Sequence, residues 1–172
     1  MSNHVCERIN IGDMVDFKHI EFNVKIQAPF SQKHIVMLVG GTGITPMIQA
    51  LHAILGENGK NGPKVTMLYG SRVEDDILGR ELIDSWADTY SDSFTNVHVL
   101  SEEPESSSWK GLRGYITREI VEKYAPGPSE DVIFFICGPP PFYNALSGPR
   151  EEKEVKGLLG EMGYSPDQVY KF

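Results

Sequence analysis

The sequence has few of the features that mark several large classes of protein. Its 172 residues contain only two cysteines, Cys6 and Cys137, which make a poor disulfide scaffold and favour a reducing compartment. No run of about 18 apolar residues occurs, and the first ten residues lack the apolar stretch of a secretory signal. We therefore expect a cytoplasmic protein, or one held on the cytosolic side of a membrane by a segment outside this chain.

Basic charge and metal-ligand patterns are also scarce. The 16 Lys and Arg residues are outnumbered by 24 Asp and Glu residues, and the net charge of −8 argues against a nucleic-acid partner. The five histidines are scattered without the spacing of metal ligands, so no metal site is expected. A content of 40% hydrophobic and 23% charged residues is typical of a soluble globular domain.

Apolar β-type runs alternate with helical patterns from residue 34 to the end of the chain. Strands are expected at 34–39, 64–70, 96–100, 131–138 and 167–172. Helices are expected at 46–55, 77–89, 115–124 and 151–162, with a loop at 144–150. This alternation predicts an α/β fold, a doubly wound parallel sheet with helices on both faces.

The first 33 residues do not follow this alternation. Residues 9–26 indicate one or two β segments around Gly12 and Asp13, with no helix between them. A strand pair of this kind is not stable alone. We therefore interpret residues 1–33 as the tail of another, β-rich domain and residues 34–172 as one separate domain.

A glycine turn, residues 40–46 with the sequence GGTGITP, follows the first predicted strand. Ligands of open parallel sheets bind beyond the carboxyl ends of the strands. We expect the three glycines to allow positive φ angles and to remove Cβ atoms that would block a ligand. Pro46 suits the first turn of a helix, whose dipole favours a pyrophosphate, and Thr42 and Thr45 add hydroxyl donors. The spacing differs from G-x-G-x-x-G, so a plain tight turn is the alternative interpretation.

A second glycine segment, residues 137–143 with the sequence CGPPPFY, follows the strand predicted at 131–138 and should reach the same sheet edge. Gly138 allows a close approach, and three prolines stiffen the chain after it. Cys137 is either a buried structural thiol or part of a site, and no activating base for a nucleophile can be assigned. Two stiffened glycine segments at one edge indicate a dinucleotide cleft.

The glycine turn and CGPPPFY resemble the motifs of the pyridine-nucleotide domain of the ferredoxin–NADP reductase superfamily, nearest to its NADH–cytochrome b5 reductase and nitrate reductase branch. GDMVDFK resembles the last strands of that family's FAD-binding β-barrel, and GLRGYIT and Phe172 follow in the family order. The resemblance implies a flavoprotein reductase in which NADH passes a hydride to FAD. Electrons then go to a haem-protein acceptor such as cytochrome b5. FAD is expected to be bound mainly by a flavin domain of the same polypeptide.

The resemblance also implies roles for individual residues. Thr45, at the junction of nicotinamide and flavin, and Cys137, near the reacting nicotinamide carbon, are the implied catalytic positions. The implied cofactor-binding residues are Gly41, Thr42, Gly43, Ile44 and Pro46 in the glycine turn, Gly138, Pro139 and Phe142 beside the nicotinamide, and Tyr115 near the adenine. Because hydride transfer is the cofactors' own chemistry, we expect these residues to place the reactants, without a covalent intermediate.

Recognition of the adenine ribose is where the sequence departs from the family pattern. NADH-preferring members carry an acidic residue at the end of the third strand, whereas this chain has Ser101 followed by Glu102 and Glu103. Glu102 is expected to accept from the ribose hydroxyls, and the alternative is that the glutamates are solvated loop charges. Arg72 would instead bind the 2′-phosphate of NADPH, and Ser71 and Ser101 are also expected to bind the cofactor. The sequence favours NADH, with NADPH as the alternative cofactor.

A second departure concerns the flavin. The family's Arg-x-Tyr-(Ser/Thr)-Pro signature is absent from the sequence, as is most of the barrel, so the chain is expected to be incomplete as an enzyme. A nucleotide-binding module without redox activity is the alternative function.

Overall fold

A computed structural model of the chain describes residues 7–16, 30–58, 62–129 and 131–172. These ranges contain one six-stranded parallel sheet with the strand order β4-β3-β2-β1-β5-β6. The strands are β1 (His34–Gly40), β2 (Lys64–Ser71), β3 (Phe94–Leu100), β4 (Leu112–Arg113), β5 (Val132–Cys137) and β6 (Val169–Lys171). The five predicted strands are therefore confirmed, and the two-residue β4 is an addition between the strand predicted at 96–100 and the helix predicted at 115–124.

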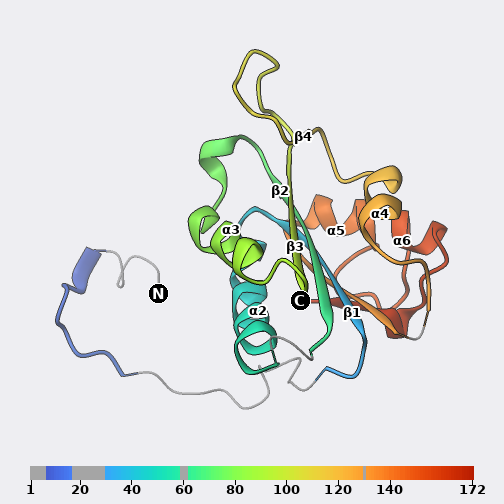
Figure 1. Cartoon of the computed structure of the whole chain (residues 1–172), viewed down its shortest axis with the longest axis horizontal. Coiled ribbons are helices and arrows are strands. Elements are labelled where there is room, and N and C mark those ends of the chain that lie inside the picture. Colours follow the sequence, from blue (N-terminus) through green and yellow to red (C-terminus); the bar gives the residue numbers. More distant parts are fainter. Residues whose placement is uncertain (1–6, 17–29, 59–61, 130) are drawn as a thin grey trace.

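Helices cover both faces of this sheet (Figure 1). The α-helices are α2 (Ile44–Asn58), α3 (Arg80–Thr89), α4 (Arg118–Tyr124), α5 (Pro140–Leu146) and α6 (Gly157–Glu161). Single 3₁₀ turns are η2 (Gly41–Gly43), η3 (Glu74–Asp76) and η4 (Pro166–Gln168). Helices α2 and α3 pack on one face and α4, α5 and α6 on the other, which confirms the doubly wound α/β fold.

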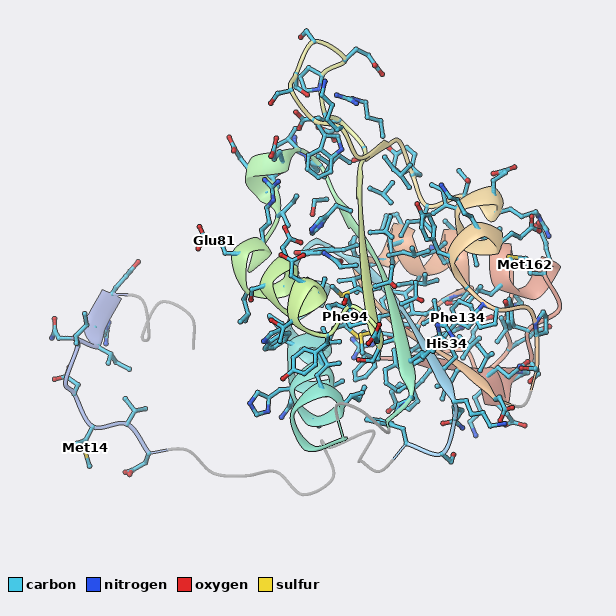
Figure 2. The ribbon with its side chains drawn as sticks, viewed as in Figure 1. Met14, His34, Glu81, Phe94, Phe134 and Met162 are labelled. Carbon is cyan, nitrogen blue, oxygen red and sulfur yellow. The ribbon has the colours of Figure 1, made fainter. Side chains whose placement is uncertain are left out.

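The burial of β1 on both faces explains its unbroken apolar sequence. Ile35 and Met37 pack into the cluster beneath α2 and α3, whereas Val36 packs into the cluster beneath α4, α5 and α6. Alternate side chains of a strand point to opposite faces, so a strand covered on both sides has no polar face. Phe94 and Phe134 mark the two layers of this core, on the α3 side and on the α4 side (Figure 2).

Three predicted helices are shorter in the structure. The helix predicted at 115–124 begins at Arg118. The helix predicted at 77–89 begins at Arg80, because Gly79 adopts a left-handed conformation with φ +68° and separates η3 from α3. The helix predicted at 151–162 is reduced to α6. Residues 151–156 instead belong to a loop whose carbonyl oxygens at Pro149, Glu152 and Glu154 accept hydrogen bonds from the Lys171 ammonium group.

The N-terminal β prediction is not supported by the part that the structure describes. Residues 9–16 contain no strand, and a turn at Ile11 and Gly12 is closed by the Asn10 amide donating to Asp13 Oδ2 at 2.7 Å. The remainder of the predicted β region, 17–26, lies outside the described residues. The division between 1–33 and 34–172 stays a prediction.

Two further features are absent from the described residues. No helix in them has the length and apolarity needed to cross a bilayer. No group of three or more His, Cys, Asp and Glu side chains in the same ranges is placed to hold a metal ion.

Candidate dinucleotide site

The two glycine segments flank the switch point of the sheet. From β1 the chain first builds outwards through β2, β3 and β4, and then returns to place β5 and β6 on the other side of β1. Such a reversal of strand order opens a crevice at the carboxyl ends of the two central strands. The glycine turn follows β1 and CGPPPFY follows β5, so both predicted segments lie at this crevice.

Close contact between these segments explains two of the glycines in the turn. A Cβ atom on Gly43 would lie 2.1 Å from the carbonyl oxygen of Cys137, a distance that no real Cβ contact has. A Cβ atom on Gly40 would lie 3.1 Å from the Phe142 ring and from Pro139. Gly40 has φ −121°, and Gly43 is not among the glycines with positive φ. The expectation that these two glycines clear space for a ligand is therefore corrected: they let the two segments interlock.

Gly138 completes the interlocked contact from the other side. Its Cβ atom would lie 2.7 Å from the Phe142 ring and 3.3 Å from the Cα atom of Gly40. Phe142 is half-buried between the two backbones, and Pro139 is exposed beside it. The residues predicted to flank the nicotinamide are thus brought together by backbone packing.

Gly41 is the one glycine of the turn that behaves as the sequence predicted. It has φ +52°, and a Cβ atom there would meet no heavy atom within 4 Å. Thr42 and Thr45 are exposed beside it, and the Thr45 hydroxyl donates to the Thr42 carbonyl at 3.3 Å. The first turn of α2 contains no acidic residue. An open, positively polarised helix start of this kind suits a phosphate group.

Ile44 and Pro46 support this turn from inside the fold. The Ile44 side chain is only 2% exposed and belongs to the core beneath α2, and its amide donates to carbonyl oxygens of the turn itself. Pro46 is half-buried in the first turn of α2, where its missing N–H is tolerated. Ile44 thus anchors the turn and leaves contact with a ligand to its neighbours.

Tyr69 is a supporting residue that the sequence interpretation missed. Its side chain is fully buried, its hydroxyl donates to the carbonyl of Gly41 at 3.2 Å, and the Leu78 amide donates to the same hydroxyl at 3.2 Å. Burial raises the pKa of this phenol, so it keeps its proton for the Gly41 bond. The hydroxyl therefore joins the glycine turn to the segment before α3.

Cys137 is half-buried at the end of β5, next to a buried tyrosine. The Tyr143 hydroxyl donates to the Phe172 carbonyl at 2.6 Å, and the Phe172 amide donates to the Ile136 carbonyl at 3.0 Å. Burial, with a further contribution from Cys137, raises the pKa of Tyr143 to about 12. Tyr143 therefore stays neutral and fixes the end of β6 beside Cys137.

The four residues predicted near the adenine ribose come together at the ends of β2 and β3. The Ser101 amide donates to the Ser71 carbonyl at 3.0 Å and the Glu102 amide to the Arg72 carbonyl at 2.8 Å, which extends the sheet ladder beyond both strands. The Arg72 guanidinium donates twice to Glu102 Oε2, at 2.9 and 3.1 Å. This ion pair holds the pKa of the Glu102 carboxyl below its ordinary value. Glu102 and Arg72, which the sequence offered as alternative ligands at the adenine ribose, therefore form an ion pair with each other.

Glu103 has a different role from Glu102. Its carboxylate accepts the backbone amide of Glu74 at 2.8 Å, and hydrogen bonding to Ser107 and to this amide lowers its pKa. It therefore fastens the β3–β4 loop to the segment before α3 and is not a free ribose ligand.

Tyr115 lies at the far end of the same sheet edge. It is 77% exposed and follows Gly114, whose amide donates to the Leu100 carbonyl at 2.8 Å. The strand order places the ends of β4 and β5 four strand spacings apart, about 19 Å. An edge of this length, with an exposed aromatic residue at one end and Cys137 at the other, suits an extended dinucleotide.

Comparison with known proteins agrees with this geometry. Residues 37–147 match the model of the oxidoreductase NAD-binding domain family. The NADH-cytochrome b5 reductase 2 of Emericella nidulans is 40% identical over 177 residues, which cover 100% of this chain and 53% of that protein. The NADH-cytochrome b5 reductase 2 of Saccharomyces cerevisiae is 38% identical, covering 94% of this chain and 54% of that protein.

Solved structures give the same assignment. The cytochrome b5 reductase domain of Ulva prolifera nitrate reductase has 27% identity and a TM-score of 0.70, covering 82% of this chain and 50% of that chain. The CS-b5R domains of human Ncb5or, in the NAD⁺ form, have 26% identity and a TM-score of 0.68, covering 95% and 43%. This chain spans about half the length of the curated relatives that it matches. The resemblance found in the sequence is confirmed, and the chain belongs to the oxidoreductase NAD-binding domain family.

Proposed function

We propose that this chain is the NADH-binding part of a flavin-dependent reductase. NADH supplies a hydride to FAD, which is held mainly by a flavin domain of the same polypeptide, and the electrons pass to a haem protein such as cytochrome b5. The protein acts in the cytoplasm or on the cytosolic side of a membrane.

The observation that carries this proposal is the arrangement at the switch point of the sheet. Because Gly43 and Gly138 have no side chain, the two glycine segments can lie in close contact. Gly41 beside them leaves open space at the start of α2. Packing of this kind fixes the backbone on both sides of one opening. A pyrophosphate placed against Gly41 would direct one nucleotide towards Cys137 and the other along the edge towards Tyr115.

The residues of this chain contribute placement. Exposed Thr42 and Thr45 offer hydroxyl donors to the phosphate path, and Pro139 and Phe142 bound the nicotinamide beside Cys137. Correct placement of two reactants supplies a large part of the rate enhancement when the reaction itself belongs to the cofactors. Cys137 and Thr45 are thus proposed to set the approach of the nicotinamide, without a covalent step.

NADH is the preferred nucleotide in this proposal. Glu102 lies at the end of β3 and is 52% exposed, with one carboxylate oxygen bound to Arg72. A carboxylate there can accept from a ribose hydroxyl and repels a 2′-phosphate. NADPH remains the second candidate because the Arg72 guanidinium is 72% exposed and is the group best suited to a phosphate.

Reconstitution tests the redox part of the proposal. The chain is mixed with an FAD-loaded flavin domain from a related reductase, and NADH-driven reduction of cytochrome b5 is followed by absorbance. We expect activity only when both proteins are present. Nucleotide binding by the chain without any cytochrome reduction would favour a binding module with no redox role.

A further inference from the structure

The β2–α3 and β3–β4 loops carry the proposed ribose-side residues Arg72 and Glu102, and one side chain touches both loops. We infer that Arg80, the first residue of α3, is a positioning residue for the adenine-ribose end of the site. This inference rests on the proposed function. Nothing in the glycine motifs or in the family comparison assigns Arg80 a role.

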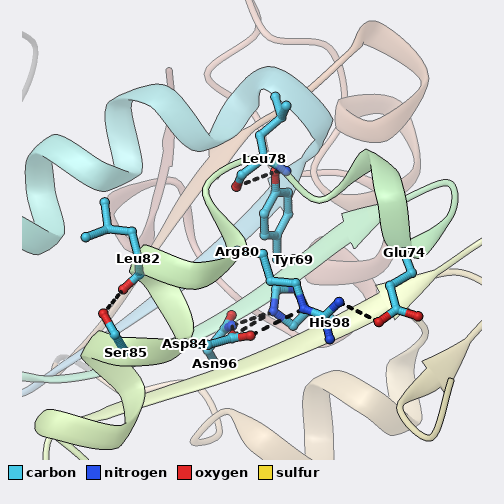
Figure 3. Close-up of polar contacts among 9 residues, drawn as sticks. All are labelled: Tyr69, Glu74, Leu78, Arg80, Leu82, Asp84, Ser85, Asn96 and His98. Atoms are coloured by element: carbon cyan, nitrogen blue, oxygen red, sulfur yellow. Dashed lines mark hydrogen bonds and ion pairs between the residues drawn. The ribbon is translucent and has the colours of Figure 1, made fainter.

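The first contact of Arg80 is with the β2–α3 loop. Its Nη1 atom donates to the Glu74 carboxylate, and Glu74 is the first residue of η3 (Figure 3). The backbone amide of Glu74 donates to Glu103 at 2.8 Å. Arg80 therefore holds the side chain of a residue whose backbone is already fastened to the second loop.

The second contact is with the β3–β4 loop itself. The Arg80 guanidinium lies 5.5 Å from the ring centroid of Trp109, within the range of a cation–π contact. Trp109 is fixed by its indole N–H, which donates to the Leu112 carbonyl at 3.2 Å. This loop projects beyond the edge of the sheet (Figure 1), where no backbone hydrogen bonds to a neighbouring strand hold it. Side-chain contacts must hold it instead.

Three partly buried polar side chains, Asp84, Asn96 and His98, lie next to Arg80. Asp84, one turn along α3, lies 3.5 Å from Arg80 Nε and accepts from the Asn96 amide at 3.0 Å. The His98 ring nitrogen Nε2 lies 3.0 Å from the same carboxylate, and the His98 ring packs edge-on against Trp109. Arg80 is thus one member of a network that joins α3, β3 and both loops, as Figure 3 shows for the residues of α3 and β3.

Network membership separates Arg80 from an ordinary surface ion pair. An isolated exposed ion pair adds little to stability. A guanidinium that contacts two carboxylates and one indole restrains the positions of all three groups. The consequence for function is that the network sets where the Glu102 carboxylate lies. When the loops are held together, the Ser101–Ser71 and Glu102–Arg72 backbone bonds place the Glu102 carboxylate at the sheet edge.

The test uses calorimetry to compare how the 172-residue chain binds two nucleotides. One is ADP-ribose, and the other is the analogue that lacks the 2′-hydroxyl of the adenosine ribose. The variant Arg80→Gln removes the charge and the forked donor, and the matched control is Arg118→Gln. Arg118 is 39% exposed against 40% for Arg80 and also contacts two carboxylates, Glu122 and Glu161. The contact with Glu161 joins α4 to α6, on the other face of the sheet.

We expect the wild-type chain and Arg118→Gln to prefer ADP-ribose by about tenfold, because a charge-assisted hydrogen bond to the 2′-hydroxyl has that value. In Arg80→Gln the preference should fall to about twofold, since Arg80 no longer holds the loop that carries Glu102 against the β2–α3 loop. A thermal melt checks that each variant is folded. If Arg80→Gln does not fold, Glu74→Gln, which removes one arm of the network, is expected to reduce the same preference.

An unchanged 2′-hydroxyl preference in a folded Arg80→Gln or Glu74→Gln variant would overturn the inference. So would an equal loss in Arg118→Gln, because the effect would then be a general loosening of the fold. If the wild-type chain binds neither nucleotide, the proposed function fails and the inference fails with it. Binding without the predicted loss contradicts the inference alone.

Discussion

The two ends of the proposed cleft are held by different kinds of force. At the nicotinamide end, Gly43, Gly138 and Phe142 interlock by backbone and ring packing. At the adenine end, the Arg72–Glu102 ion pair is more than half exposed, and Arg80 joins the loops through charge and an indole face. Tight packing leaves no room for even one added methyl group. Substitution of an exposed charged residue changes stability or affinity only by a moderate amount. The difference predicts large losses of stability from substitutions at the nicotinamide end and graded changes of nucleotide specificity at the adenine end.

Substitution at Gly43 should give the largest effect. In Gly43→Ala the new methyl group would lie 2.1 Å from the Cys137 carbonyl oxygen, so the two segments must separate. We expect a loss of about 3 kcal/mol in the free energy of unfolding, at the upper end of overpacking costs. Urea denaturation measures it.

The control for that experiment is Gly56→Ala, in α2, where a Cβ atom meets nothing within 4 Å. Because alanine is the better helix former, this variant should gain about 1 kcal/mol. Similar stabilities for the two variants would show that the contact between the glycine segments is not tight.

Substitution at Gly41 separates binding from stability. Gly41→Ala places a methyl group in the open space at the start of α2 and strains a residue with φ +52°. Gly163→Ala is its matched control, because Gly163 has φ +88° and equally open surroundings, away from the glycine segments. Both should lose about 1 kcal/mol of stability, and only Gly41→Ala should lose NADH affinity, by about tenfold or more. Equal affinities for the two variants would argue against a pyrophosphate at Gly41.

A graded change is expected at the adenine end. In Glu102→Gln the Arg72 guanidinium loses its anionic partner and becomes free to bind a 2′-phosphate. The ratio of NADPH to NADH affinity should rise by about tenfold, the order of one charge-assisted hydrogen bond. Glu105→Gln, in the same loop and also exposed, is the control and should leave the ratio unchanged. A ratio that does not move in Glu102→Gln contradicts the assignment of the ribose end.

The smallest effect concerns the pH dependence of stability and arises at His34, at the start of the central strand β1. Burial, aided by Lys64, lowers the pKa of His34, whose Nε2 atom is 2.9 Å from Thr66 Oγ1. The unfolded chain therefore takes up this proton first, at a pKa of about 6.5. The stability contributed by His34 should be present above that pH and be lost as the pH falls below it.

Urea denaturation between pH 7.5 and pH 5 measures this effect, with His34→Gln as the reference. The stability difference between the wild-type chain and the variant should shrink towards pH 5. A difference that is constant or grows would contradict the assigned shift.

The sequence predicted the sheet because its central strands β1, β2 and β5 are mostly buried and carry apolar residues along most of their length. It predicted less about the glycines, since the residue facing a missing Cβ atom is set by tertiary contact, as between Gly43 and Cys137. The 151–156 segment has a helical pattern, but its loop carbonyls are bound by the distant Lys171.

The adenine end was the least predictable part of the site. Arg72 and Glu102 were expected to compete as ribose readers, and only the register of β2 and β3 shows that they pair. The contacts of Arg80 involve two loops and the start of a helix. No local sequence pattern predicts that these three segments come together. Charged surface residues carry little structural signal on their own, so this network becomes visible only in the fold.

Calorimetric titration of the chain with NADH and then with NADPH, in the absence of flavin, tests the central claim most directly. The account predicts that both bind at one site per chain and that NADH binds more tightly, because the Gly41 turn receives the pyrophosphate and Glu102 disfavours the 2′-phosphate. Binding of neither nucleotide would contradict the claim that the two glycine segments form a working dinucleotide site.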